Sequence, residues 1–101
     1  IENDNIAIIG IDESKRLYVT PMREEFPYIY RAAMQVNWDD NGKCLYSPVP
    51  SEWTYLQWFQ QIIAAANSEY GVSLAISHGT QWESIDNDLK HQILTAMGYK
   101  T

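Results

Sequence analysis

The sequence predicts an α+β fold, in which a mainly antiparallel sheet of about five strands carries two helices on one face. Short β-branched or alternating segments lie within residues 5–47 and at residues 72–77, and helical spacing appears in residues 51–70 and 80–97. Turn residues separate these segments, which gives the element order ββββαβα. With 46% hydrophobic and 13% aromatic residues, a chain of this length builds one core, so residues 1–101 form a single predicted domain.

The first two predicted strands form a hairpin. Residues 6–11 are short, β-branched and bounded by polar residues, which is typical of a strand buried on both faces. The segment Asp12–Lys15 has turn chemistry. Leu17–Thr20 then forms a returning strand, and Pro21 stops it.

Residues 28–38 show the clearest alternation in the chain. The apolar or aromatic side chains at its even positions are Tyr28, Tyr30, Ala32, Met34, Val36 and Trp38. This period of two predicts a long strand with one apolar face. Asp39–Gly42 is a predicted turn, because Asn-Gly tolerates positive φ, and Lys43–Ser47 pairs back antiparallel until Pro48.

Two helices and a fifth strand complete the pattern. Ser51 is the predicted N-cap of the first helix, and apolar residues at helical spacing follow until Gly71 ends it. Residues 72–77 alternate and predict the fifth strand. The segment Thr80–Glu83 matches a capping box, which predicts that the second helix begins there and ends at Gly98.

Composition and charge exclude several classes of function. Seven Lys and Arg against 13 Asp and Glu give a net charge of −6, and the basic residues are scattered, so no nucleic-acid partner is predicted. No apolar stretch approaches the ~18 residues that cross a membrane, so a soluble protein is expected. The single cysteine, Cys44, forms no internal disulfide, which is compatible with the cytoplasm. Residues 1–5 lack a signal-peptide pattern, and Ile1 suggests a trimmed chain.

No motif predicts catalysis, a metal ion or a cofactor. The paired carboxylates are expected in turns, where adjacent side chains diverge instead of meeting across a cleft. Cys44 has no basic neighbour in sequence, and no serine lies in a GxSxG setting. The two histidines, His78 and His91, lack a third metal ligand at suitable spacing. The five glycines are too dispersed for a phosphate-binding loop, so the chain is not predicted to be an enzyme.

Aromatic residues around the first helix are candidate binding residues. Trp53, Tyr55 and Trp58 flank its apolar stripe, and Tyr46 precedes it. Some of these rings are therefore expected outside the core, where exposed Trp and Tyr favour interfaces. The alternative is that the rings wrap the edge of a small core.

Arg31 and His78 complete the candidate set. Arg31 is a cation in an otherwise neutral predicted strand, where it either donates to a carboxylate ligand in a groove or lies on a solvated face. It also has acidic candidates for structural pairing, namely Glu24, Glu25 and Glu69. His78 precedes a predicted helix N-terminus, where anions bind, but a loop followed by a helix cap is the preferred interpretation.

Four short segments resemble a known group of proteins: Tyr30–Ala33, Val36–Asp39, Leu45–Pro48 and Glu69–Val72. Together with size and element order, they resemble the small α+β proteins carried on mobile integron gene cassettes in bacteria, and less closely small bacterial immunity proteins. None of the segments is a catalytic or binding motif, so the resemblance implies no site residues. It implies a bacterial cytoplasmic accessory protein, often oligomeric.

Two functions remain open. The first is a non-enzymatic accessory protein that acts by binding, forms a homo-oligomer through an aromatic surface or the uncovered sheet face, and engages a basic protein partner. The second is a small-molecule binding protein, or a minor enzyme, with a pocket between helices and sheet. The predicted lining of that pocket is Tyr30, Trp53, Trp58 and Trp82, with Arg31 orienting the ligand.

Overall fold

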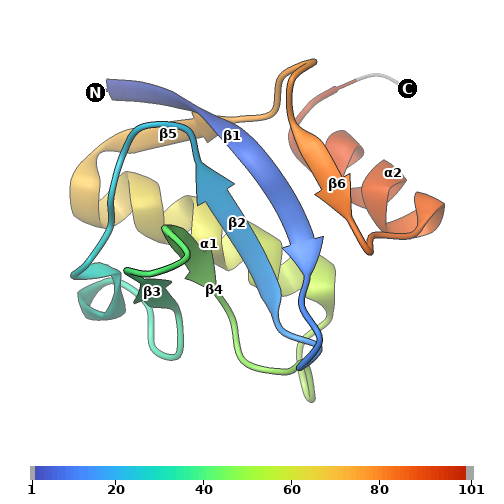
Figure 1. Ribbon diagram of the computed structural model, residues 1–101, viewed down its shortest axis with the longest axis horizontal. Coiled ribbons are helices and arrows are strands. Elements are labelled where there is room, and N and C mark those ends of the chain that lie inside the picture. The colour runs from blue at the N-terminus through green and yellow to red at the C-terminus, as the bar shows by residue number, and fades with distance from the viewer. Residues whose placement is uncertain (1, 100–101) are drawn as a thin grey trace.

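A six-stranded sheet with two helices on one face makes up the computed structural model, which describes residues 2–99 (Figure 1). The elements in chain order are β1 (Glu2–Ile11), β2 (Leu17–Pro21), the 3-10 helix η1 (Ile29–Arg31), β3 (Asn37–Asp39), β4 (Cys44–Tyr46), α1 (Tyr55–Tyr70), β5 (Val72–Ala75), β6 (Gln81–Glu83) and α2 (Asn87–Ala96). The predicted α+β class with a mostly antiparallel sheet is confirmed.

The long strand β1 organises the sheet, whose order is β3-β4-β2-β1-β5 with β6 also paired to β1. The β1–β2, β2–β4 and β3–β4 pairs are antiparallel. On the other edge of β1, β5 pairs in parallel with Glu2–Asn5, and β6 pairs in parallel with Ile8–Gly10. Two short strands therefore follow one another along one edge of β1 (Figure 1).

A β-bulge divides β1 into two halves at Ala7. On β2, Ile6 pairs with Pro21 but Ile8 pairs with Thr20, so β1 holds one extra residue there. The extra residue shifts the alternation by one. Asp4 and Ile6 are buried before the bulge, and Ile9 is buried after it.

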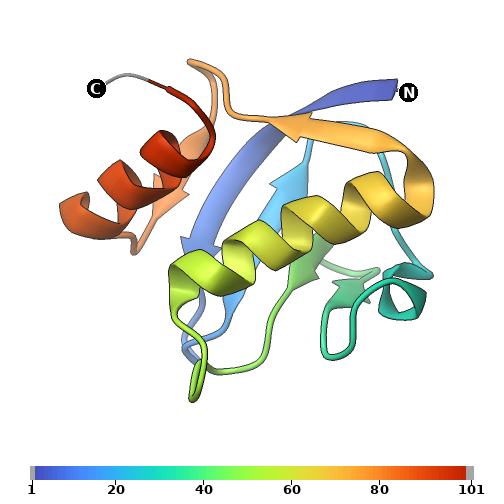
Figure 2. The same ribbon diagram turned by 180° about the vertical axis from the view of Figure 1, so that it is seen from behind.

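The core lies between the helices and one face of the sheet (Figure 2). Its fully buried side chains come from the sheet, both helices and the segment around η1, and include Ile6, Ile9, Val19, Phe26, Ile29, Phe59, Ile62 and Ile93. Burying this apolar set removes it from water, which is the main favourable term in folding. Among residues 2–99, no helix combines the length and apolar character that crossing a membrane requires.

The limits of α1 follow from its caps. Thr54 is the N-cap: its hydroxyl accepts from the Gln57 backbone at 3.2 Å, and the Gln57 side chain accepts from the Thr54 backbone at 2.8 Å. The prediction of Ser51 as N-cap is wrong, because the Thr54–Gln57 box satisfies two orphan backbone donors at once. The predicted end is confirmed: Gly71 is left-handed with φ 65°.

The predicted long strand over residues 28–38 is wrong. The segment forms η1 and turns, and only its last two residues join β3. Tyr28, Tyr30 and Met34, expected on the apolar face, are exposed. The buried residues are Phe26, Ile29, Ala33 and Val36, whose spacing of three and four is that of a helix. The segment therefore fits both a strand period of two and a helical spacing of three and four. Packing into the core selects the helical spacing.

The predicted capping box at Thr80–Glu83 is also wrong. The Thr80 hydroxyl donates to the Ile6 carbonyl at 2.6 Å and accepts from the Ser77 backbone N–H at 3.0 Å. Residues 81–83 form β6, which brings the sheet to six strands rather than about five. The helix α2 begins later, at the N-cap Asp86, whose carboxylate accepts from the Leu89 N–H at 2.8 Å.

Candidate functional site

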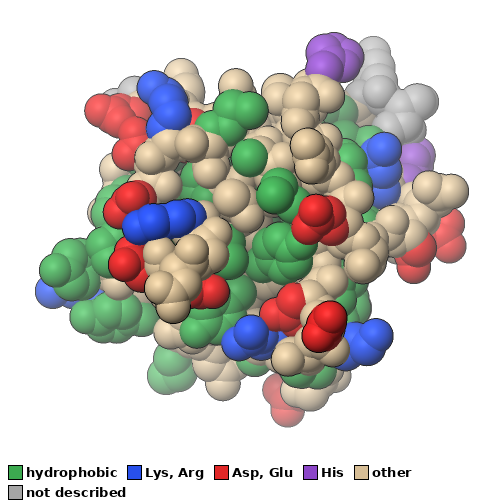
Figure 3. Space-filling view, in the orientation of Figure 1, with side chains coloured by type: hydrophobic (Ala, Val, Ile, Leu, Met, Phe, Trp, Pro, Cys, Tyr) green, Lys and Arg blue, Asp and Glu red, His purple; other side chains and the backbone are tan. Residues whose placement is uncertain are grey.

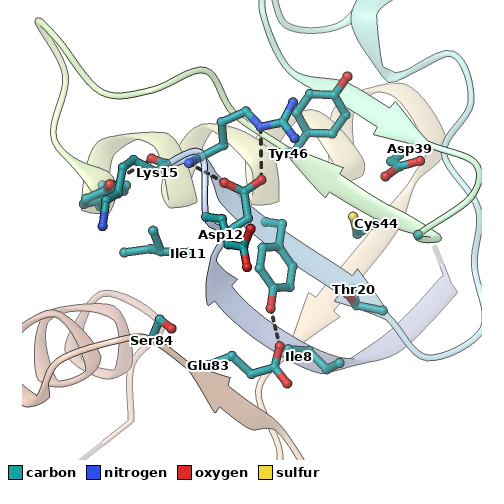
Figure 4. Close-up of a pocket in the computed structure, with 15 residues that line it drawn as sticks. Ile8, Ile11, Asp12, Lys15, Thr20, Asp39, Cys44, Tyr46, Glu83 and Ser84 are labelled. Atoms are coloured by element: carbon teal, nitrogen blue, oxygen red, sulfur yellow. Dashed lines mark hydrogen bonds and ion pairs between the residues drawn. The ribbon is translucent and has the colours of Figure 1, made fainter.

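The face of the sheet opposite the helices carries an open hollow of about 1010 Å³, here called the sheet groove (Figure 4). Its lining comes from β1, β2, β3, β4, β6, the turns beside them and the start of α1: Ile8, Ile11, Asp12, Glu13, Lys15, Arg16, Tyr18, Thr20, Asp39, Gly42, Cys44, Tyr46, Tyr55, Glu83 and Ser84. Acidic and hydrophobic side chains lie side by side on this face (Figure 3).

Strand alternation places the groove side chains. Tyr18 and Thr20 lie two residues apart on β2, and Cys44 and Tyr46 lie two apart on β4, so each pair shares a face. Leu17, Val19 and Leu45 point the other way and are buried. The register pairs Tyr18 with Tyr46, which brings two phenol rings to neighbouring strands.

Tyr18 lies flat on β1 because its cross-strand partner is Gly10. A Cβ at Gly10 would stand 2.4 Å from the Tyr18 hydroxyl oxygen and 2.5 Å from Cζ, so any larger residue displaces the ring. The Tyr18 hydroxyl donates a hydrogen bond to the Glu83 carboxylate on β6. Burial and the Glu83 charge raise the pKa of Tyr18, so the phenol keeps its proton.

The groove holds a second carboxylate and a second tyrosine ring, those of Asp12 and Tyr46. The Asp12 carboxylate accepts from the Arg16 backbone N–H at 2.9 Å and from Arg16 Nε at 3.0 Å. The Arg16 guanidinium carbon lies 4.7 Å from the centre of the Tyr46 ring. Burial acts to raise the pKa of Asp12, but the hydrogen bonds from Arg16 outweigh it and hold the pKa below its usual value. The carboxylate therefore stays charged.

Cys44 and Tyr55 border the groove, where the Cys44 thiol is protonated and the Tyr55 hydroxyl is hydrogen-bonded. Burial and the nearby Asp39 raise the pKa of Cys44 to about 11, so the thiol is protonated at neutral pH. A protonated thiol is a weak nucleophile. The Tyr55 hydroxyl donates to the Lys15 carbonyl at 2.8 Å, which ties the β1–β2 turn to α1. Within the described part of the chain, no three His, Cys, Asp or Glu side chains gather to hold a metal ion.

The groove is negatively charged overall. Four carboxylates line it, from Asp12, Glu13, Asp39 and Glu83, against the two cations of Lys15 and Arg16. Arg16 is already paired with Asp12. The other ion pairs across residues 2–99 join Arg23 to Asp4, and Lys43 to Glu25 and Asp40. Glu83 therefore takes part in no ion pair with the described residues.

The structure divides the predicted binding residues between several places. Tyr46 and Tyr55 line the sheet groove. Trp53 and Trp58, whose ring centres are 4.7 Å apart, line a second hollow near the start of α1 instead. Trp58 is 8% exposed and belongs to the core, whereas Trp53 is 41% exposed.

Arg31 and His78 lie outside both hollows. Arg31 is exposed at the end of η1, where its guanidinium carbon is 4.8 Å from the Tyr28 ring centre. His78 is exposed in the turn between β5 and β6. The other predicted pocket residues are apart as well, because Tyr30 makes an edge contact with Tyr28, and Lys90 covers the Trp82 ring at 5.3 Å. Buried apolar side chains fill the layer between helices and sheet.

Sequence reasoning missed the centre of the groove, namely Gly10, Tyr18 and Glu83. One signal was present, because a glycine inside a strand pattern often marks a close approach. Glu83 gave no such signal, since the assignment to a capping box accounted for it locally. Its contact with Tyr18 joins residues 65 positions apart.

The comparisons with known proteins agree on one family. The sequence profile described as "Integron Cassette Protein Hfx_Cass5" matches residues 4–80. A solved structure of integron cassette protein Hfx_Cass5, from the mobile metagenome of the North West Arm sewage outfall, is 45% identical. The alignment covers 96% of this chain and 97% of that chain, with a TM-score of 0.49. No curated protein matches. The resemblance to integron cassette proteins is confirmed, and the chain belongs to the Hfx_Cass5 integron cassette protein family.

Proposed function

We propose that this chain is a non-enzymatic accessory protein of the bacterial cytoplasm, and that its sheet groove binds a basic segment of a protein partner. The observation that carries the proposal is the groove itself, an open hollow of about 1010 Å³ with tyrosines and carboxylates in its lining. Tyrosine gives large contact area, and the acidic rim selects positive charge.

Two physical arguments support a chain segment as the ligand. The groove is open along the sheet face, whereas sites for small molecules usually enclose most of the ligand surface. The net charge of −6 favours encounter with a basic partner, since complementary potential raises association rates. The hydroxyls of Tyr18 and Tyr55 already have acceptors within the chain, so a partner meets their rings instead.

A charge-matched pair of variants tests the groove. We expect the double variant Asp39→Asn/Glu83→Gln to weaken binding of a lysine- and arginine-rich peptide by about tenfold, which corresponds to ~1.4 kcal/mol. The control Glu69→Gln/Asp88→Asn makes the same charge change on α1 and α2, and we expect its affinity to stay within about twofold of the wild type. Isothermal titration calorimetry at two salt concentrations measures both.

Three results would contradict this proposal. Equal loss in the two double variants would mean that net charge alone attracts the peptide. Affinity independent of salt would exclude a charge-driven contact. No measurable binding at low salt would remove the basic partner altogether.

A second candidate function, self-association as a homo-oligomer, is favoured by an exposed apolar patch. This apolar patch consists of Met34, Val49 and Trp53, which line one hollow together with Pro48 and Trp58. Met34 is 84% exposed and Val49 is 52% exposed. Contiguous exposed apolar surface marks contact sites in soluble proteins.

Solution mass tests the apolar patch. We expect the wild type to form a dimer or larger oligomer that persists at high salt, because an apolar contact is not screened. Met34→Glu places a charge in the patch and should yield monomer, whereas Met22→Glu, at another exposed methionine outside the second hollow, should not. Size-exclusion chromatography with light scattering distinguishes these outcomes. A monomer at every concentration would contradict self-association.

A further inference from the structure

The sheet groove contains two similar pairs, each made of a carboxylate and a tyrosine ring. In the first pair, Asp12 and Tyr46 hold the guanidinium of Arg16 between them. In the second pair, Glu83 accepts the Tyr18 hydroxyl through Oε1. No cation among residues 2–99 pairs with Glu83, and its Oε2 has no hydrogen-bond partner among them.

We propose that Glu83 and Tyr18 form a subsite for one arginine side chain of the protein partner. This inference rests on the proposed function of the sheet groove and specifies which residue type the partner presents. The guanidinium would donate to the Glu83 carboxylate and stack on the side of the Tyr18 ring away from Gly10. A carboxylate and a ring together bind a planar cation that can donate and stack at once.

Gly10 is what makes the Tyr18 ring available. One side of the ring lies against the Gly10 backbone, within 2.4–2.7 Å of where a Cβ would be. Tyr18 is half-buried and lines the groove, so the rest of the ring borders that space. The hydrogen bond from the Tyr18 hydroxyl fixes the Glu83 carboxylate at the edge of the ring (Figure 4). Both partners of the cation are therefore held in place before it arrives, which lowers the entropy cost of binding.

Arg16 adopts a comparable arrangement, between a carboxylate and a tyrosine ring, in the same groove. Its Nε lies 3.0 Å from Asp12 while its guanidinium carbon lies 4.7 Å from the Tyr46 ring centre. A lysine ammonium is a compact point charge and gives up either the stacking area or the planar hydrogen bonds. The chain's own arginine thus indicates arginine as the preferred residue of the partner.

Repulsion from Arg16 does not prevent a second guanidinium. The charge of Arg16 is already matched by Asp12, to which Arg16 donates from Nε at 3.0 Å. Each cation would have its own carboxylate, Asp12 or Glu83. The groove would then carry two further carboxylates, from Glu13 and Asp39, against the single remaining cation of Lys15.

The test uses two blocked peptides of equal charge, pentalysine and its analogue with a central arginine. We expect the wild type to bind the arginine peptide about tenfold more tightly. Glu83→Gln and Tyr18→Leu should each reduce this preference to about one, because each removes one partner of the guanidinium. The control Asp88→Asn, on α2, should keep the preference. Chemical shifts of the Tyr18 ring protons should move on addition of the arginine peptide in the wild type.

The outcomes separate this inference from the proposal beneath it. Equal binding of both peptides by the wild type overturns the arginine subsite and leaves a basic partner standing. If Glu83→Gln keeps the preference for the arginine peptide, the arginine binds elsewhere, and the subsite at Glu83 and Tyr18 is also overturned. Binding of neither peptide overturns both proposals. If free arginine amide binds as tightly as the peptide, the ligand is not a protein segment. Thermal unfolding of each variant identifies any that fails to fold. If Tyr18→Leu fails to fold, Tyr18→Phe, which keeps the ring, replaces it, and we then expect a partial loss of the preference for the arginine peptide.

Discussion

Asp4, on the first half of β1, is 2% exposed and accepts four hydrogen bonds from residues 2–99. Glu83, paired beside the second half, is exposed, and among the same residues it accepts from Tyr18 alone. The donors to Asp4 are the backbone N–H groups of Asn5, Arg23 and Glu24, at 2.9–3.0 Å, and Arg23 Nε at 3.3 Å. Asp4 is complete within the fold, because buried carboxylates persist when fully hydrogen-bonded. Glu83 has hydrogen-bonding capacity that the described part of the chain does not use.

The bulge at Ala7 and the side chain of Thr80 separate these two environments. The bulge turns the second half of β1 by one residue, which brings Gly10 beneath Tyr18 on the open face. Thr80 bonds the Ile6 carbonyl where β5 gives way to β6. The first half of β1 thus contributes the buried Asp4 to the fold, and its second half contributes lining residues to the groove.

The largest expected effect separates the two carboxylates directly. Asp4→Asn replaces an acceptor with an amide whose NH₂ faces backbone donors, and we expect the free energy of unfolding to fall by about 3 kcal/mol. The matched change Glu83→Gln should cost less than about 0.5 kcal/mol, because Glu83 is exposed. Urea denaturation measures both. Equal losses would contradict the assignment of Asp4 to structure and Glu83 to binding.

Thr80→Val should give the next largest effect. Valine keeps the shape but leaves the Ile6 carbonyl and the Ser77 N–H without the hydroxyl, so we expect a loss of about 2 kcal/mol. Thr80→Ser keeps the hydroxyl and should lose roughly half as much or less. Hydrogen exchange should show the β6 amides losing protection in the valine variant. If valine and serine behave alike, Thr80 does not hold β5 and β6 together.

Gly10→Ala should affect the groove more than the fold. The new methyl group overlaps the Tyr18 ring, whose far end can swing away, so we expect a loss of only about 1 kcal/mol in stability. The Tyr18–Glu83 hydrogen bond is lost with that movement, and binding of the arginine peptide should weaken about tenfold. Gly79→Ala, in an exposed turn where a Cβ would have only Ser77 Oγ near it, is the matched control. Unchanged affinity in Gly10→Ala would show that the ring position is unimportant.

The smallest expected effect is a pH dependence from Asp4. Burial acts to raise the pKa of Asp4, but the backbone and Arg23 hydrogen bonds outweigh it, so the pKa lies below its usual value of 3.8. A depressed folded-state pKa gives stability that is present above the unfolded pKa and is lost as the pH falls through the folded one. Asp4→Asn should therefore flatten the decline in unfolding free energy below about pH 4, measured by urea denaturation. Asp12→Asn serves as the comparison, since the pKa of Asp12 is also lowered. An equally steep decline in Asp4→Asn would contradict this role.

The elements that the sequence predicts well are those decided by near neighbours. The β1–β2 and β3–β4 hairpins and the end of α1 at Gly71 depend on turn residues and on one left-handed glycine. Residues 28–38 fit two periods at once, and only the packing of Ile29, Ala33 and Val36 into the core decides between them. Local patterns cannot make that choice.

The candidate site was predictable only at its rim. Tyr46 and Tyr55 stood out as aromatic residues near the first helix, and both line the groove. Its centre depends on contacts between distant segments, such as Thr80 with Ile6 across 74 positions. The local pattern at Thr80–Glu83 predicts a capping box, but a hydrogen bond between distant segments determines the structure there.

The division of one sheet edge between β5 and β6 has a consequence for aggregation. Each strand leaves only three or four residues at the edge, and the exposed turn with His78 interrupts them. The opposite edge strand, β3, is three residues long as well. Neither edge offers the long row of unpaired backbone groups on which β-sheets from different molecules stack into fibres. These short edges therefore disfavour the edge-to-edge polymerisation to which sheet proteins with exposed aromatic residues are prone.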